Sequence, residues 1–199
     1  MIAFVRHGQT ELNRGGRLQG RIDAPLSELG VEQAAALGRG FASMPVTRVF
    51  SSPLQRAHAT AAAIAAGHAL TVETDDRLIE LDYGAWDGLP LASVAPADWA
   101  AWRSDPDFAP PGGERLADVT ARVRSFCTEV FAAHADDLVV AVSHVSPIKA
   151  AVCTALRVGD LATWQMQLSV AAVTSIGRRP DGSAYLFSFN DTSFVSALG

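Results

Sequence analysis

The chain has 199 residues, 49% of them hydrophobic, and a formal net charge of -5 at pH 7. This length and apolar content suffice for one compact domain, residues 1–199, and are too small for two. The negative charge argues against a general nucleic-acid surface, and no apolar run is long enough for a membrane span or a signal segment. We therefore expect a cytoplasmic protein that binds neither nucleic acid nor membrane. Cys127 and Cys153 lie far apart in apparently helical surroundings and are expected to be free buried thiols.

Short apolar runs between turn signals predict strands, and longer stretches with helical spacing predict helices. In chain order the expected strands cover residues 2–6, 46–50, 70–73, 138–143, 171–177 and 184–189, and the expected helices cover 27–43, 53–67, 115–134 and 146–157. This alternation favours a three-layer α/β/α fold around a mostly parallel sheet of about six strands. Pro180-Asp181-Gly182 predicts a hairpin between the last two strands, which makes one strand antiparallel at an edge of the sheet.

The first predicted strand, residues 2–6, leads into Arg6, His7 and Gly8. Ligands of open α/β sheets bind at the carboxyl ends of strands, so His7 is expected at the edge of the sheet that binds the ligand. Arg6 offers a positive fork for phosphoryl oxygens, Gly8 allows backbone N–H groups to come close, and a neutral histidine is a competent nucleophile. Taken alone, the motif is equally typical of a solvated strand end with a capping histidine.

The second predicted strand, residues 46–50, is followed by signals for a helix start. Pro53 suits the first position of a helix, and Ser51 or Ser52 suits its N-cap. Arg56 then lies one turn inside a helix whose N-terminus favours anions.

Residues 84–113 interrupt the alternation of strands and helices, and we expect them to form a cap over the active site. This segment contains four large aromatic residues, Trp86, Trp99, Trp102 and Phe108. They either pin the cap to the body of the protein or wall the pocket around the organic part of a substrate.

The strand expected at 138–143 is the most hydrophobic of the chain, and it leads into His144. Ser146 and Pro147 open the helix that follows, and Ser143 is expected to support the strand end. Three predicted strand ends thus bring arginine or histidine to one edge of the sheet, where these side chains are suited to bind the same phosphate.

With these motifs the chain resembles the histidine phosphatase superfamily, in its phosphoglycerate-mutase-like branch, over nearly its whole length. The blocks that carry the resemblance are Arg6-His7-Gly8-Gln9-Thr10-x-x-Asn13, Leu18-Gln19-Gly20, Leu26-Ser27-x-x-Gly30-x-x-Gln33-Ala34, Ser51-Ser52-Pro53-Leu54-x-Arg56-Ala57-x-x-Thr60-Ala61, Glu80-x-x-x-Gly84-x-Trp86-x-Gly88, Gly112-Gly113-Glu114 and Ser143-His144. The run from Ser143 to Lys149 is similar to the small bacterial acid-phosphatase and α-ribazole-phosphatase-like members. The family usually continues its second histidine with two glycines, whereas Val145 and Ser146 stand here.

The resemblance also implies which residues act. In the family the first histidine becomes phosphorylated, two arginines and a second histidine clamp the phosphoryl group, and an acidic residue protonates the leaving group. Carried over by position, the expected catalytic residues are His7, Arg6, Arg56, His144 and Glu80. The residues expected to bind substrate beside them are Gly8, Asn13, Gln19, Ser52 and Val145. Glu80 must hold a proton for the first step and, once ionised, activates the water that hydrolyses the phosphohistidine.

The implied function is hydrolysis of a phosphomonoester of a small metabolite. A 2,3-bisphosphoglycerate-dependent phosphoglycerate mutase is the alternative, but family mutases carry extra basic residues after the glutamate. Residues 81–113 hold five aspartates against Arg103 alone, and an acidic cap repels polyanions, which favours the phosphatase. A protein that binds phosphorylated ligands without turnover is a remote alternative.

No cofactor or metal is expected, because Arg6 and Arg56 would repel a cation from the two histidines. Arg14, Arg17 and Arg21 follow the first motif and are either solvated charges or contacts for a second anionic group of the substrate. The expected partner is a small phosphomonoester. The sequence leaves open whether the chain is a monomer or a homodimer.

Overall fold

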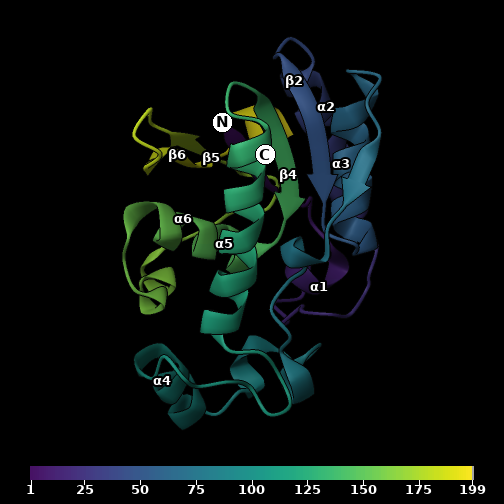
Figure 1. The fold of residues 1–199 in the computed structure, drawn as a ribbon. Helices are drawn as coiled ribbons and strands as arrows, with labels where there is room; N and C mark the ends of the chain where they lie inside the picture. The colour runs from purple at the N-terminus through teal and green to yellow at the C-terminus, as the bar shows by residue number, and fades with distance from the viewer. Residues whose placement is uncertain (199) are drawn as a thin grey trace.

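The computed structural model describes residues 1–198 and shows a six-stranded sheet between helical layers (Figure 1). The strands are β1 (Ile2–Arg6), β2 (Val46–Ser51), β3 (Val72–Thr74), β4 (Leu138–Ser143), β5 (Val173–Arg178) and β6 (Ala184–Asp191), and the helices are α1 (Glu11–Arg14), α2 (Glu28–Phe41), α3 (Gln55–Ala66), α4 (Pro96–Ser104), α5 (Leu116–Ala133) and α6 (Val145–Leu156). Short 3-10 turns cover Asp76–Leu78, Gly84–Trp86, Leu91–Ser93, Asp160–Gln165 and Ser193–Leu198. All the predicted strands and helices are confirmed, with β3 and β5 beginning two residues later than expected, and α1 and α4 are additional.

The strand order β3-β2-β4-β1-β5-β6 explains why the three motif-bearing strand ends meet. β3, β2, β4 and β1 are parallel, with Arg6 level with Ser143 and Ser51 level with Val142. The residues that follow β1, β2 and β4 therefore leave the sheet at the same edge. β5 runs antiparallel to β1 and pairs with the edge strand β6, which confirms the mostly parallel sheet with an antiparallel hairpin at one edge.

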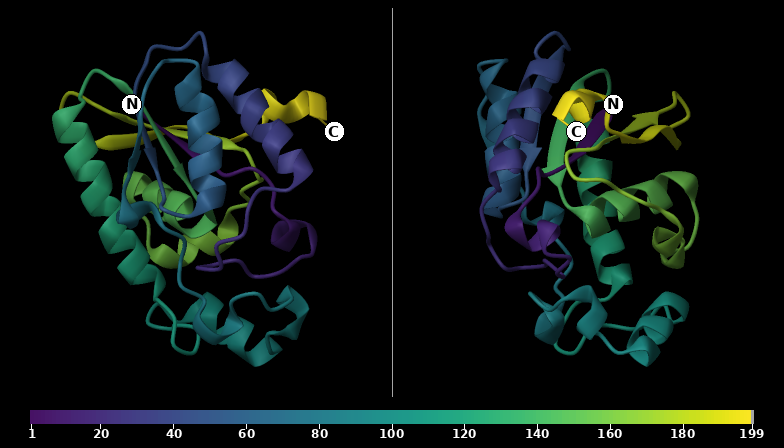
Figure 2. Two further views of the ribbon diagram at one scale, coloured as in Figure 1. Left: turned by 90° about the vertical axis from the view of Figure 1, so that its right-hand side faces the viewer. Right: turned by 180° about the vertical axis from the view of Figure 1, so that it is seen from behind.

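Helices α2 and α3 cover one face of the sheet, and α5 and α6 cover the other (Figure 2). Side chains along a strand alternate between the two faces. In β1, Ile2 and Phe4 accordingly pack toward α5 and α6, whereas Ala3 and Val5 pack toward α2 and α3. All four are buried, which is why this strand is a continuous apolar run in the sequence.

The start of α3 differs from the expectation. The helix begins at Gln55 with Leu54 at the N-cap and no side-chain cap hydrogen bond, so Pro53 precedes the helix and neither serine caps it. The Gln55 amide instead donates to Asp23 Oδ1 at 2.7 Å. Asp23, from a loop distant in sequence, thus takes the place of a local N-cap side chain. The Ser52 hydroxyl contacts His144 instead.

The cap, residues 84–113, lies at one end of the molecule and carries α4 (Figure 1). Its aromatic side chains pack on one another and on the body. The Trp99 and Trp102 rings stack with centroids 5.6 Å apart, and Trp102 meets Trp164 edge-on at 4.9 Å. None of the four cap aromatics lines the pocket at the carboxyl ends of β1 and β4, and their ring contacts pin the cap to the body.

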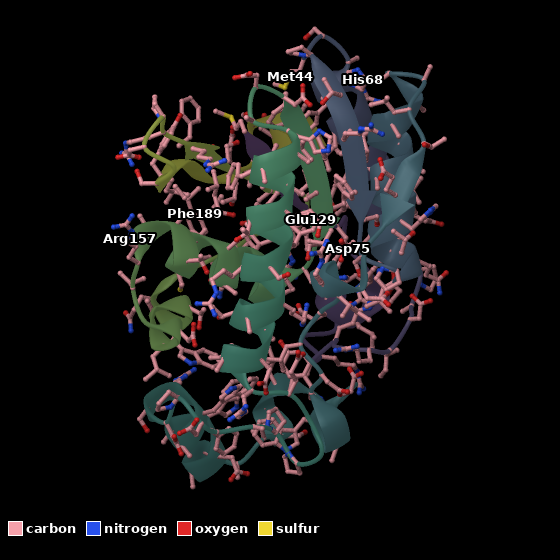
Figure 3. The ribbon with its side chains drawn as sticks, in the orientation of Figure 1. Met44, His68, Asp75, Glu129, Arg157 and Phe189 are labelled. Atoms are coloured by element: carbon pink, nitrogen blue, oxygen red, sulfur yellow. The ribbon has the colours of Figure 1, made fainter. Side chains whose placement is uncertain are left out.

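The segment after β3 is braced against α5 by Arg77. Its Nη2 donates to Asp75 Oδ2 at 2.6 Å, and its Nη1 donates to Glu129 Oε2 at 2.8 Å; Figure 3 labels the two acids. This bridge holds the turn 76–78, and the chain reaches Glu80 two residues later.

Within residues 1–198, no helix is both long and apolar enough to cross a membrane. Cys127 and Cys153 are buried free thiols, as expected. Burial raises the pKa of Cys127 to about 12 and the pKa of Cys153 to about 11, so both thiols stay protonated.

Candidate active site

A pocket of about 260 Å³ opens at the carboxyl ends of β1 and β4. The expected site residues that line it are Arg6, His7, Asn13, Gln19, Glu80 and Val145. Arg56 and His144 are fully buried next to His7, and Ser52 contacts His144 from behind.

The imidazole of His7 is oriented by its own backbone. Nδ1 lies 2.7 Å from Gly8 O, and since a carbonyl only accepts, Nδ1 must carry the ring proton. Nε2 is then unprotonated, and its lone pair accepts a hydrogen bond from Arg56 Nε at 3.3 Å. Burial, together with the charges of Arg6 and Arg56, lowers the pKa of His7 well below 6.5. The ring is therefore neutral at pH 7, with Nε2 ready to act as a nucleophile.

Arg56 is held in place by the loop that follows α1. Its Nη1 donates to Ile22 O and its Nη2 to Gly20 O, each at 2.8 Å. The backbone N–H groups of residues 20–22 all donate to the Asp87 carboxylate of the cap, at 2.7 to 2.8 Å. Asp87 thus anchors the carbonyls that orient Arg56, a role that no local sequence signal indicated.

Arg6 lines the pocket from the end of β1. Its Nη1 donates to Leu168 O at 2.7 Å, while its buried Nε has no partner within residues 1–198. Burial lowers the pKa of Arg6 to about 10, so the guanidinium stays charged at pH 7.

His144 is positioned by Ser52. The Ser52 hydroxyl lies 2.7 Å from His144 Nε2 and accepts from the Leu54 amide at 3.3 Å. Its hydrogen is therefore available for Nε2, which favours an imidazole proton on Nδ1, an atom without a partner in the described residues. Burial, and then the nearby His7, lowers the pKa of His144 well below 6.5. Ser52 positions the His144 ring and does not line the pocket.

Glu80 is buried and binds the first turn of α6. Its Oε1 accepts from the amides of Leu81 and Ser146, at 2.8 and 3.1 Å. Its Oε2 accepts from the Val145 amide at 3.0 Å. The helix starts at Val145, one residue earlier than expected, with His144 at its N-cap. The Val145 amide is thus engaged by Glu80, and Val145 itself lines the pocket.

Gly8, expected to contact substrate, does not line the pocket. Its amide donates to Thr60 Oγ1 at 3.2 Å. A Cβ on Gly8 would lie 2.5 Å from Gly30 O, so glycine is needed here for close packing of the strand end against α2. Ser143, as expected, supports its strand end by donating to Leu78 O at 2.6 Å.

Asn13 and Gln19 lie side by side at the mouth of the pocket. Gln19 Oε1 accepts from Asn13 Nδ2 at 3.3 Å and from Thr10 Oγ1 at 2.7 Å. These two hydrogen bonds fix the orientation of the Gln19 side-chain amide. Its Nε2 is buried, has no partner in residues 1–198 and can donate to a ligand.

The acidic residues that follow Glu80 lie away from the pocket. None of the five aspartates of residues 81–113 lines it. Two of them bind the backbone instead: Asp87 binds the loop 20–22, and Asp82 accepts from the Gly84 amide at 2.8 Å.

Two cations line the pocket besides Arg6, namely Arg17 and Lys149. Arg14 and Arg21 instead pair with glutamates. Sequence reasoning did not single out Lys149 as a site residue, although it lies four residues after Val145 on α6, a spacing that places both on one face. Tyr83 and Gln167 also line the pocket and carried no such signal. Among residues 1–198, no three His, Cys, Asp or Glu side chains are grouped to hold a metal ion.

Two neutral histidines with Arg6 and Arg56 close to them agree with the sequence motifs. Residues 2–192 match the sequence model of the histidine phosphatase superfamily, branch 1. The chain belongs to this superfamily. Its fold is phosphoglycerate mutase-like, as the resemblance implied.

Curated relatives of this chain include a bifunctional protein of Mycobacterium tuberculosis that is 36% identical over 198 residues. The match covers 98% of this chain but 54% of that protein, so the chain spans about half of its length. Phosphoserine phosphatase 1 of Hydrogenobacter thermophilus is 37% identical over 179 residues, which are 88% of this chain and 85% of that one. Among solved structures, a mycobacterial glucosyl-3-phosphoglycerate phosphatase in complex with VO3 has a TM-score of 0.89 at 33% identity, covering 96% of this chain and 99% of that chain.

Proposed function

We propose that the chain hydrolyses phosphomonoesters of small metabolites through a phosphohistidine on His7. The observation that carries the proposal is the state of this ring: neutral, held by Gly8 O so that Nε2 is unprotonated, and flanked by two arginines. The relatives named as phosphatases of phosphoserine and of glucosyl-3-phosphoglycerate support this substrate class.

The pocket supplies donors for the phosphoryl oxygens. Arg6 Nε, Gln19 Nε2 and His144 Nδ1 are buried N–H groups that have no hydrogen-bond partner within residues 1–198. Donors that are fixed before the substrate arrives stabilise the charge that develops on a transferring phosphoryl group. Arg56 Nε, 3.3 Å from the attacking atom, adds a further positive charge.

In the first step His7 Nε2 forms a bond to phosphorus while the ester P–O bond breaks. Protonated Glu80, which lines the same pocket, passes its proton to the leaving oxygen. Water then attacks phosphorus and gives a proton to the Glu80 carboxylate, and the N–P bond breaks. Phosphate is released, and His7 returns to its neutral form.

The test is covalent trapping. Brief reaction with labelled phosphomonoester and a denaturing quench should give an acid-labile, base-stable adduct on the wild type. His7→Ala should show no adduct and lose at least about a thousandfold in kcat. His58→Ala, which removes an exposed histidine of α3, is the matched control and should behave as wild type. A labelled serine, or full activity of His7→Ala, would overturn the assignment.

We further propose that residues 1–199 form one domain with the cap at 84–113 and that the enzyme is cytoplasmic. The two buried free thiols support a reducing compartment. Fractionation of cells that produce the protein tests its location, and light scattering on the purified protein distinguishes one chain from two.

A further inference from the structure

A second, smaller cavity of about 60 Å³ adjoins the catalytic pocket. Tyr83, Val145 and Lys149 line both spaces, so the two share a wall. The far side of the small cavity is formed by Trp164 and Thr163 of the turn 160–165, together with one cap tryptophan, Trp102.

Three polar groups of the residues that line this cavity lack partners in residues 1–198. Trp102 Nε1, Trp164 Nε1 and Thr163 Oγ1 are buried and make no hydrogen bond within residues 1–198. Trp102 is 2% exposed and Thr163 is 4% exposed, so bulk water does not reach them. An indole N–H only donates, and buried donors are normally paired. Three unpaired groups around one small space therefore indicate that something with acceptor atoms belongs there.

Lys149 adds a charge to the same wall. It is the only lysine among the 16 basic residues of the chain. It is half-buried on α6 and forms no ion pair and no hydrogen bond in the described part of the chain. Its pKa is lowered from the ordinary value, chiefly by burial and also by the positive charge of Arg6, and the negative charge of Glu80 offsets part of this effect. An ammonium group in this position interacts more strongly with an anion than with water.

The donor set specifies the ligand. One ammonium and two indole N–H groups match two acceptor oxygens that share a single negative charge, which describes a carboxylate. A second phosphoryl group carries about two charges and is usually held by several cations. We infer that this cavity is a carboxylate subsite, which makes the preferred substrate a small phosphomonoester that also bears a carboxylate. The inference rests on the proposed function and adds a specificity determinant to it.

The first experiment compares substrates that differ only at the carboxylate. The pairs are 3-phosphoglycerate with glycerol 3-phosphate, and phosphoserine with phosphoethanolamine, and p-nitrophenyl phosphate serves as the common reference. The wild type should prefer the carboxylated member of each pair by tenfold or more in kcat/KM. Lys149→Met and Trp164→Phe, which removes one N–H group and keeps a ring, should reduce that ratio at least about threefold. Arg103→Met is the matched control, since Arg103 is exposed and lies over the Trp164 ring without lining the cavity, and it should keep the ratio.

The second experiment does not depend on turnover. In the inactive His7→Ala protein, acetylation at Lys149 is followed by mass spectrometry, which is direct because no other lysine exists. 3-Phosphoglycerate should protect Lys149, and glycerol 3-phosphate at equal occupancy should not. Equal rates on both members of the pairs, an equal loss on both in Lys149→Met, or equal protection would overturn the subsite while leaving the phosphatase intact. A wild type that fails on every phosphomonoester, p-nitrophenyl phosphate included, refutes the proposed function itself.

Discussion

Replacing Asp87 by Asn tests whether the cap positions the catalytic arginine. In the wild type, one carboxylate oxygen accepts from the Gly20 amide and the other accepts from the amides of Arg21 and Ile22. Asparagine has one acceptor oxygen, so its NH₂ group must face at least one backbone N–H. Hydrogen bonds to a charged acceptor contribute about 1.5–3 kcal/mol each. We expect Asp87→Asn to lower the free energy of unfolding by about 2 kcal/mol, or Tm by roughly 4–8 °C for a chain of this size.

The same change should slow the reaction. The carbonyls of Gly20 and Ile22 that hold Arg56 belong to the anchored loop, so the guanidinium beside His7 Nε2 loses its fixed position. A displacement of about 1 Å in such a group costs roughly a hundredfold in rate. We expect kcat to fall by roughly tenfold to a hundredfold with a smaller change in KM, because Arg6 still binds the phosphoryl group.

The assay is steady-state hydrolysis of p-nitrophenyl phosphate at 20 °C, with thermal unfolding measured on the same samples. Asp98→Asn is the matched control, because it removes the same charge from an exposed position of the cap. A kcat for Asp87→Asn within twofold of the wild type, or an equal loss in Asp98→Asn, would refute the positioning role.

Three further results are expected. Glu80→Gln should slow alkyl phosphates by roughly two to four decades and p-nitrophenyl phosphate by much less, since a good leaving group needs little protonation; equal losses would mean that Glu80 is not the acid. His7 and His144 have pKa values lowered well below 6.5, so the unfolded chain binds more protons between those values and pH 6.5. The free energy of unfolding should therefore fall on acidification below pH 6.5 by up to about 1.4 kcal/mol per pH unit per histidine. Denaturant titrations at several pH values measure this free energy, and it should change less steeply with pH in His7→Asn than in the wild type. With 3-phosphoglycerate and a trace of 2,3-bisphosphoglycerate, phosphate release should outpace formation of 2-phosphoglycerate, and rapid isomerisation with little phosphate would place the chain among the mutases.

Local sequence predicted the strands and the residues at their ends, because hydrophobic periodicity is a property of neighbouring positions. His7 comes two residues after a four-residue apolar run, and His144 follows the most apolar strand. Their place at the carboxyl edge of the sheet could therefore be deduced from the sequence alone. Pairing of β1 with β4 then made Arg6 level with Ser143, which agrees with the expectation that these strand ends meet.

Hydrogen-bond partners across long sequence separations were decided by the tertiary structure alone. Asp87 meets the Gly20 amide 67 residues away, His144 meets Ser52 across 92 residues, and Glu80 takes the Val145 amide across 65. The sequence determined which residue types gather at the sheet edge. It could not determine which donor each acceptor takes, because that choice depends on distances and directions between segments that only the packed fold sets. For the same reason Asp87 of the cap binds backbone amides and does not line the pocket, and the cavity beside Lys149 had no signature in the chain.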